Sequence, residues 1–97
     1  MTSKATDILH SLMLRCEGWV GHCVWCGIDI VAVGLIPKWV PHYQRTHDHR
    51  VMLMINGIEY LMEAASVDHY FERNSGGRSE PRNILPSCRR CNTRRSI

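Results

Sequence analysis

Apolar positions in the first part of the chain recur with the spacing of an α-helix. One side of a helix from Ser3 to about Cys16 would carry Ile8, Leu9, Leu12, Met13 and Cys16. Ser3 or Thr6 is positioned to cap this helix, and Gly18 to end it. A stripe of this kind usually packs into a core. We therefore expect Cys16 to be a buried apolar residue rather than a metal ligand.

The middle of the chain favours β-structure. Residues 28–40 are β-branched and apolar enough for a strand, which should stop near Pro37 and Pro41. The polar residues 42–50 include a His-x-His sequence, but a solvated loop explains them better than a metal site does. Two β-prone runs, 51–55 and 58–62, flank Asn56-Gly57, which predicts a hairpin with a type I′ turn.

The last third of the chain alternates short β-prone runs with polar segments. It predicts a strand at 66–71, a flexible loop at 74–79, a second strand at 83–85 and a helix at about 89–95. Adjacent residues of a strand point to opposite faces. Asp68 and His69 can therefore serve one site only if the strand bends or if the site wraps around its end.

Two Cys-x-x-Cys pairs stand far apart in the sequence. One pair suits either zinc binding or thiol redox chemistry, but two pairs in one short chain favour a tetrahedral zinc site. Such a site is structural, because four thiolates leave no open position for substrate or water. It would stabilise a chain of 97 residues by on the order of 10 kcal/mol. The expected ligands are Cys23, Cys26, Cys88 and Cys91.

Charge is unevenly distributed along the chain. Residues 1–65 carry five basic and six acidic side chains, whereas residues 66–97 carry seven arginines and three acids. A basic end on a near-neutral body indicates a polyanionic partner. No apolar run is long enough to span a membrane, and the N-terminus lacks the features of a secretory signal. We expect a cytoplasmic protein without a membrane partner.

Four polar residues of the basic end suit metal-assisted hydrolysis. Histidine is the side chain best suited to act as a general base near neutral pH, which makes His69 a candidate, and Asp68 offers a hard oxygen to a divalent cation. Asn92 follows a cysteine ligand directly, so its amide oxygen would be held near that cation. Asn83 is a candidate for fixing the tautomer and ring orientation of His69.

The order of these residues resembles a known family. Asp68-His69, Gly76-Gly77, Asn83-Ile84-Leu85 and Cys88-x-x-Cys91-Asn92 are similar to the motif of the HNH endonucleases, whose fold is called ββα-metal. The resemblance covers residues 66–97 closely and 23–27 by motif. It implies a small ββα-metal core held by a four-cysteine zinc. With the N-terminal helix and the extra β-hairpin, which lie outside the resemblance, the expected fold class is α+β.

A chain of 97 residues is long enough for one small domain, so we expect a single HNH nuclease domain over residues 1–97. Residues 1–22 form its N-terminal helix and lead-in, residues 23–65 its first zinc knuckle, strand and hairpin, and residues 66–97 its catalytic motif. Glu72 departs from the family, many members of which have proline there. The helix at the C-terminal end is either short or completed by a partner.

The resemblance also implies roles. His69 would activate water, Asn83 would orient His69, and Asp68 and Asn92 would bind a catalytic Mg²⁺, Mn²⁺ or Ni²⁺ beside the structural Zn²⁺. The substrate would be DNA, cut on one strand or both to give a 5′-phosphate and a 3′-hydroxyl. The candidate contacts to its backbone are Arg78, Arg82, Arg89, Arg90, Arg94 and Arg95.

Two other functions stay open on the sequence alone. One is a non-catalytic zinc-ribbon module that binds nucleic acid, and the other is a redox or metal-storage protein built on the cysteines. The sequence also leaves open whether the chain is a monomer or a homodimer. Stand-alone nucleases of this size are typical of phages and mobile elements, which would put the protein in the cytoplasm of a bacterial host.

Overall fold

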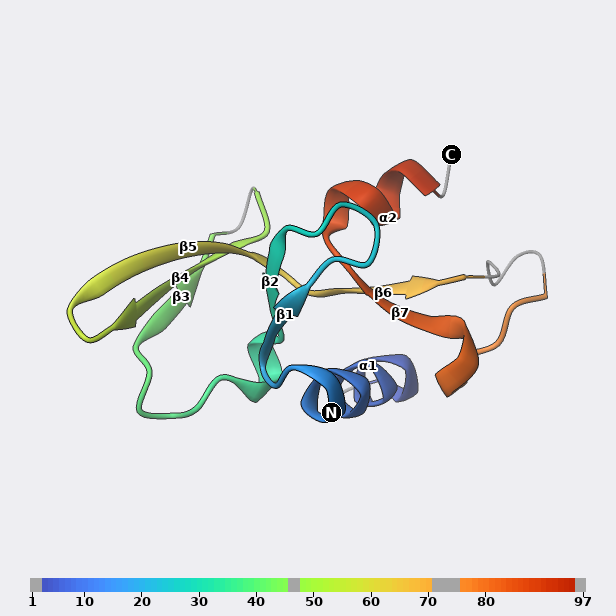
Figure 1. Ribbon diagram of the computed structural model, residues 1–97, viewed down its shortest axis with the longest axis horizontal. Coiled ribbons are helices and arrows are strands. Elements are labelled where there is room, and N and C mark those ends of the chain that lie inside the picture. Colours follow the sequence, from blue (N-terminus) through green and yellow to red (C-terminus); the bar gives the residue numbers. More distant parts are fainter. Residues whose placement is uncertain (1–2, 46–47, 71–75, 96–97) are drawn as a thin grey trace.

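The computed structural model describes residues 3–45, 48–70 and 76–95, and it has the mixed α+β composition that the sequence predicts (Figure 1). In chain order its elements are α1 (Lys4–Cys16), β1 (Val20–His22), β2 (Asp29–Val31), the 3₁₀ helix η1 (Val33–Leu35), β3 (His42–Gln44), β4 (Arg50–Ile55), β5 (Ile58–Ala64), β6 (Ser66–His69), the 3₁₀ helix η3 (Pro81–Asn83), β7 (Ile84–Ser87) and α2 (Arg89–Arg95).

Helix α1 is capped as predicted. The Ser3 side chain accepts a hydrogen bond from the backbone N–H of Thr6 at 3.1 Å, which satisfies one of the unpaired donors at the helix start. At the other end Gly18 has a φ of 101°, and its N–H donates to the Met13 carbonyl. Leu9 and Met13 are buried, but Cys16 is exposed. The prediction that Cys16 is buried is therefore wrong, because the buried side of α1 ends at Met13 and residues 14–17 are exposed.

The predicted hairpin is confirmed as part of a larger sheet. Asn56 and Gly57 have φ values of 51° and 78°, as a type I′ turn requires, and they join β4 to β5 in antiparallel register. The strand order of this five-stranded sheet is β1-β2-β5-β4-β3, with β2 and β5 parallel. In Figure 1 strands β3 to β5 form an arm that extends away from both α-helices.

Two predictions for the middle of the chain need correction. The strand expected over residues 28–40 is confined to β2, because the chain turns into η1 directly after Ala32. The loop expected over residues 42–50 contains β3, whose backbone pairs with β4 although all three of its side chains are exposed. Its polarity reflects an edge strand, which needs no buried face to form.

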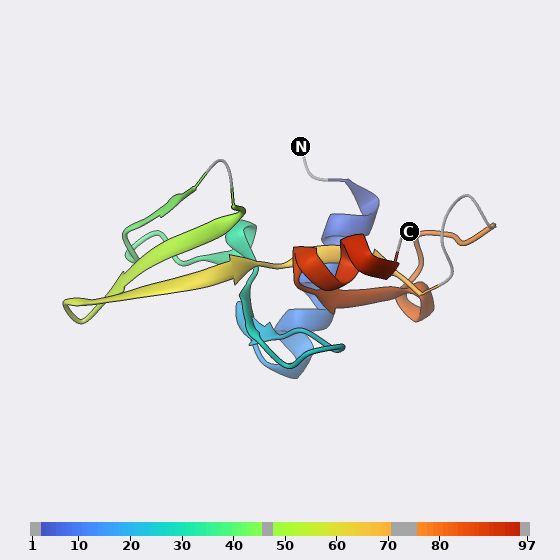
Figure 2. The same cartoon turned by 90° about the horizontal axis from the view of Figure 1, so that it is seen from above.

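Strands β6 and β7 form a separate antiparallel hairpin, followed by α2. The predicted C-terminal helix is confirmed, and β6 ends at His69, earlier than predicted. Phe71 of the predicted strand and the beginning of the expected 74–79 loop lie outside the described residues, as does Glu72. The hairpin lies between α1 and α2 (Figures 1 and 2), and β5 leads into β6 through Ala65 alone.

Two clusters of buried side chains meet at β2. Ile30 and Val31 are both fully buried, and they point to opposite faces of the strand. Ile30 packs with α1, β7 and two of the cysteines, whereas Val31 packs with Val51 and Leu53 of the arm. The β4–β5 hairpin of the arm therefore packs on the body through one face. Strand β2 connects the arm to the part of the molecule that holds the cysteines.

Truncating the buried face of the arm should destabilise the protein. Leu53 is 0% exposed and Met54 is 37% exposed, although they are neighbours on β4. We expect Leu53→Ala to lower the free energy of unfolding by about 2–5 kcal/mol, through lost burial and the cavity left behind. Met54→Ala, the matched control, should cost less than about 1 kcal/mol. Urea unfolding of both variants measures the difference, and equal losses would contradict this assignment of faces.

Candidate active site and metal centre

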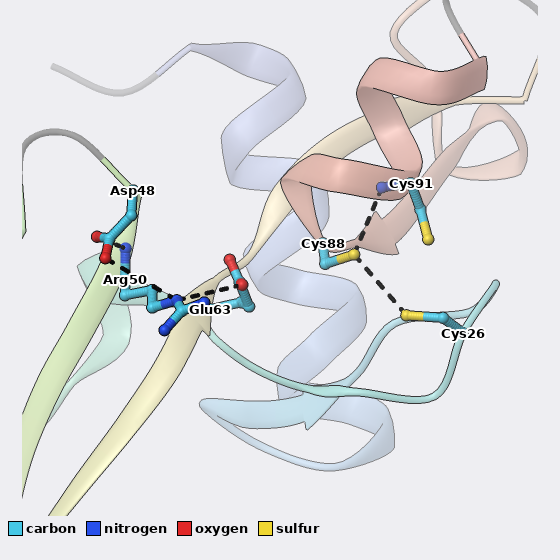
Figure 3. Close-up of polar contacts among 6 residues, drawn as sticks. All are labelled: Cys26, Asp48, Arg50, Glu63, Cys88 and Cys91. Carbon is cyan, nitrogen blue, oxygen red and sulfur yellow. Dashed lines mark hydrogen bonds and ion pairs between the residues drawn. The ribbon is translucent and has the colours of Figure 1, made fainter.

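The two Cys-x-x-Cys pairs converge in space. Cys23 and Cys26 lie in the turn between β1 and β2, whereas Cys88 and Cys91 lie where β7 passes into α2. The four cysteine sulfur atoms all lie within 4.8 Å of one another, so the cluster could hold a metal ion. Figure 3 shows Cys26 and Cys88 facing each other, with their sulfurs 3.8 Å apart. Cys16 is not part of this cluster.

Backbone geometry supports the cluster from both sides. Gly27 has a φ of 76° and donates its N–H to the Cys23 carbonyl, which closes the first turn tightly. At the second turn the N–H of Cys91 points at the Cys88 sulfur from 3.5 Å. Cys23 and Cys88 are buried, whereas Cys26 is exposed, so the cluster lies at the edge of the core.

The thiols of the cluster differ in acidity. Burial is the largest influence on Cys23 and would raise its pKa, but hydrogen bonds from the backbone at Cys88, Cys26 and Trp25 together outweigh it and lower the pKa to about 6. Burial raises the pKa of Cys88, and it raises the pKa of Cys91 to about 12, with help from the neighbouring sulfurs. At neutral pH and without a metal ion, Cys88 and Cys91 therefore keep their protons.

Asp68 lies on β6 and is only 1% exposed. The indole Nε1–H of Trp25 donates to its Oδ2 at 2.9 Å. Trp25 is one of the two residues between Cys23 and Cys26, so the first cysteine turn reaches the carboxylate directly. Sequence reasoning did not single out Trp25, because nothing in the sequence indicates a contact across 43 positions.

His69 is the last residue of β6, and Tyr70 bends the chain immediately after it. Its Nε2 lies 3.0 Å from the hydroxyl oxygen of Ser79. The neighbouring Asp68 instead faces Trp25. The two side chains thus have different partners, as expected for neighbours on a strand, and the chain bends only after His69. That one site uses both residues stays a prediction. Ser79 was also missed, since its only signal was a hydroxyl close to the Gly76-Gly77 pair.

Asn83 ends η3 and is 5% exposed. Its side-chain Nδ2 donates to the Arg78 carbonyl at 2.9 Å, and its own carbonyl accepts from the N–H of Tyr70 at 3.0 Å. These bonds connect the two ends of the segment between β6 and β7. Arg78 directly precedes Ser79, whose hydroxyl contacts His69. The first bond therefore connects Asn83 to His69 indirectly, through Arg78 and Ser79.

Asn92 lies on α2 and faces β6. Its Nδ2 donates to the Val67 carbonyl and to the Ser66 hydroxyl, both at 2.8 Å. An amide group has two N–H donors, and these two bonds use both. The orientation of the amide oxygen is consequently fixed. The anchoring carbonyl belongs to the residue directly before Asp68, so Asn92 is held next to the predicted metal-binding aspartate.

The candidate arginines fall into two groups. Arg89, Arg90 and Arg94 are exposed on α2, and they line a cavity of about 530 Å³ together with Thr93 and residues 48–50 and 63. Arg78 and Arg82 are exposed in the segment before β7 and do not line this cavity. Arg95 belongs to α2, but its side chain is outside the described part of the chain.

On the side of this cavity formed by residues 48–50 and 63, acidic side chains balance the positive charge of Arg50. Arg50 of β4 lies 3.9 Å from Asp48 and 3.6 Å from Glu63 of β5, so its charge is already paired (Figure 3). Arg89 contacts the ring of His49. The excess positive charge of the cavity therefore comes from α2. None of the described helices is long and apolar enough to cross a membrane.

A comparison with protein families finds a match that includes the β6–β7 hairpin and α2. The family model described as HNH endonuclease matches residues 54–96, which include β6, β7 and α2. The resemblance seen in the sequence is thus confirmed over these residues, and the match indicates nuclease activity and a nucleic-acid substrate in general terms. No curated protein and no solved structure matches the chain.

Metal binding at the four cysteines should depend on pH. Cys88 and Cys91 have raised pKa values, so binding must displace their protons, and affinity should fall as the pH is lowered. We expect a loss of about tenfold per pH unit for each proton released, measured between pH 8 and pH 6 by competition with a zinc indicator. Cys16→Ser should leave the profile unchanged. Equal affinity at both pH values would contradict the assignment.

Proposed function

We propose that this chain, whose residues 54–96 belong to the HNH endonuclease family, is a metal-dependent endonuclease that hydrolyses DNA phosphodiester bonds. The observation that carries the proposal is the pair of bonds from Asn92 to Ser66 and Val67, which hold it against the strand that contains Asp68 and His69. We treat residues 1–97 as one nuclease domain.

Zinc is the metal that we assign to the four cysteines. A tetrahedral zinc with bonds of about 2.3 Å to sulfur holds its ligands about 3.8 Å apart. The Cys26 and Cys88 sulfurs have this separation. Four thiolates fill the coordination shell, so this metal supports the fold and takes no part in hydrolysis. It joins the β1–β2 turn to the start of α2, which carries Asn92.

Asp68 and Asn92 are the residues that we assign to a second, catalytic cation. A carboxylate oxygen and an amide oxygen are hard ligands, which suit Mg²⁺ or Mn²⁺, and the family resemblance adds Ni²⁺ as an alternative. When bound, the cation stabilises the negative charge that develops on the phosphate and on the leaving 3′ oxygen. Asp68 is buried and Asn92 is anchored by two bonds, so neither ligand needs to reorganise during the reaction.

His69 is the general base in this mechanism. If Nε2 carries the ring hydrogen and donates it to Ser79, the lone pair on Nδ1 accepts the proton from the attacking water. The opposite tautomer would place the hydrogen on Nδ1 and block this step. The contact with Ser79 holds the ring of His69 in place, and Asn83 supports Ser79 through the bond to Arg78.

The arginines of α2 are the proposed contacts to the phosphate backbone. Arg89, Arg90 and Arg94 line one cavity on the side of α2 that faces the arm. Phosphate contacts of this kind carry little sequence information, and they weaken as the salt concentration rises. Arg78 and Arg82 would contact the substrate from the opposite end of the hairpin.

Replacing His69 should abolish cleavage and preserve binding. In a plasmid-nicking assay with Mg²⁺, Mn²⁺ or Ni²⁺, we expect His69→Ala to cut about 10²–10⁴ times more slowly than wild type, because water loses its proton acceptor. His42→Ala, on the exposed edge strand, should keep wild-type activity. Gel-shift titration should give the same DNA affinity for all three proteins.

Wild type and His69→Ala could prove equally inert while both bind DNA. That result would refute the enzyme and favour a non-catalytic zinc-ribbon module that binds nucleic acid. Zinc analysis tests the remaining alternative. Reversible thiol chemistry without one tightly held zinc per chain would indicate a redox or metal-storage protein.

A further inference from the structure

Trp25 lies between the four-cysteine cluster and Asp68. It lies between Cys23 and Cys26, and its indole N–H donates to the Asp68 carboxylate at 2.9 Å. The carboxylate is 1% exposed, so water does not replace a lost donor easily. The ring itself is 43% exposed, so a large part of this side chain lies outside the core.

The cysteine turn that carries Trp25 is fixed on the catalytic hairpin at a second point. The N–H of Val24 donates to the carbonyl of Pro86 on β7 at 3.1 Å. Trp25 contacts β6 and Val24 contacts β7, so the turn is docked across both strands. Its own shape depends on Gly27, which has a positive φ, and on the cysteines at either end.

We propose that Trp25 is a positioning residue through which the four-cysteine site sets the affinity of Asp68 for the catalytic cation. A neutral donor on Oδ2 fixes the carboxylate without competing for the cation's charge. Removing a group that hydrogen-bonds to a metal ligand typically lowers metal affinity by about 10–100-fold. This inference rests on the proposed function, because it takes Asp68 as a ligand of the cation.

The test measures cation binding without DNA. The zinc-loaded chain is titrated with Mn²⁺, and free Mn²⁺ is followed by electron paramagnetic resonance. Trp25→Phe keeps an aromatic ring and removes the N–H, so we expect Mn²⁺ affinity to fall by about 10–100-fold. Zinc content should stay at one per chain. Trp39→Phe makes the same chemical change at a tryptophan that is 74% exposed, and should bind Mn²⁺ as wild type does.

The variant Asp68→Asn distinguishes a failure of this inference from a failure of the proposed cation site on which it rests. If Asp68→Asn loses Mn²⁺ binding while Trp25→Phe binds as tightly as wild type, the role of Trp25 is refuted and the catalytic site stands. If wild type binds Mn²⁺ no better than Asp68→Asn, the proposed cation site fails and this inference fails with it.

A second measurement needs no variant at Trp25. In the nitrogen-15 NMR spectrum of the wild-type chain, Mg²⁺ should shift the indole N–H signal of Trp25, because its acceptor takes part in coordination. The indole signal of Trp39 should not move, and Asp68→Asn should remove the shift at Trp25. A Trp25 signal that is insensitive to Mg²⁺ in wild type would overturn the inference.

Discussion

The convergence of four cysteine sulfurs on one point is the constraint on which the rest of this structure depends. It joins the turn after β1 to the junction of β7 and α2, two segments separated by most of the chain. Cys23 and Cys88 are also part of the buried cluster that contains Leu9 and Ile30. The cysteine cluster and the hydrophobic core are therefore continuous. A chain of 97 residues has only a small core, so an additional stabilising site matters for its stability.

The same junction determines the geometry of the proposed active site. Helix α2 begins directly after Cys88, and Asn92 lies on its first turns, bonded to the backbone of β6. From the other side, the turn that carries Cys23 reaches Asp68 through Trp25. Both proposed ligands of the catalytic cation are thus held by elements that end at the cysteines. We infer that the structural metal aligns the cation site as well as stabilising the fold.

Local signals in the sequence were sufficient for much of this architecture. The cap at Ser3, the Asn56-Gly57 turn and α2 each follow from the chemistry of a few neighbouring residues, and the structure has all three. The pairing of the cysteines was also predictable, because the chelating geometry of Cys-x-x-Cys restricts the alternatives. In the same way, the order of Asp68, His69, Asn83 and Asn92 indicated the family before the fold was known.

What the sequence did not reveal depends on contacts between distant segments. Strand β3 forms because its backbone pairs with β4, although its side chains give no strand pattern. The exposure of Cys16 follows from how α1 lies on the core, which its periodicity alone does not define. Trp25 and Ser79 acquire their roles only when the fold brings them to Asp68 and His69.

The central claim is that one metal ion at the four cysteines holds the catalytic hairpin and α2 in place. The most direct test removes zinc from the chain with a chelator and follows the backbone NMR signals of residues 66–70 and 84–95 together with DNA cleavage. The account predicts one zinc per chain, loss of the dispersed signals and of cleavage when zinc is removed, and recovery of both when it is returned. A zinc-free chain that keeps these signals and still cleaves DNA would contradict it.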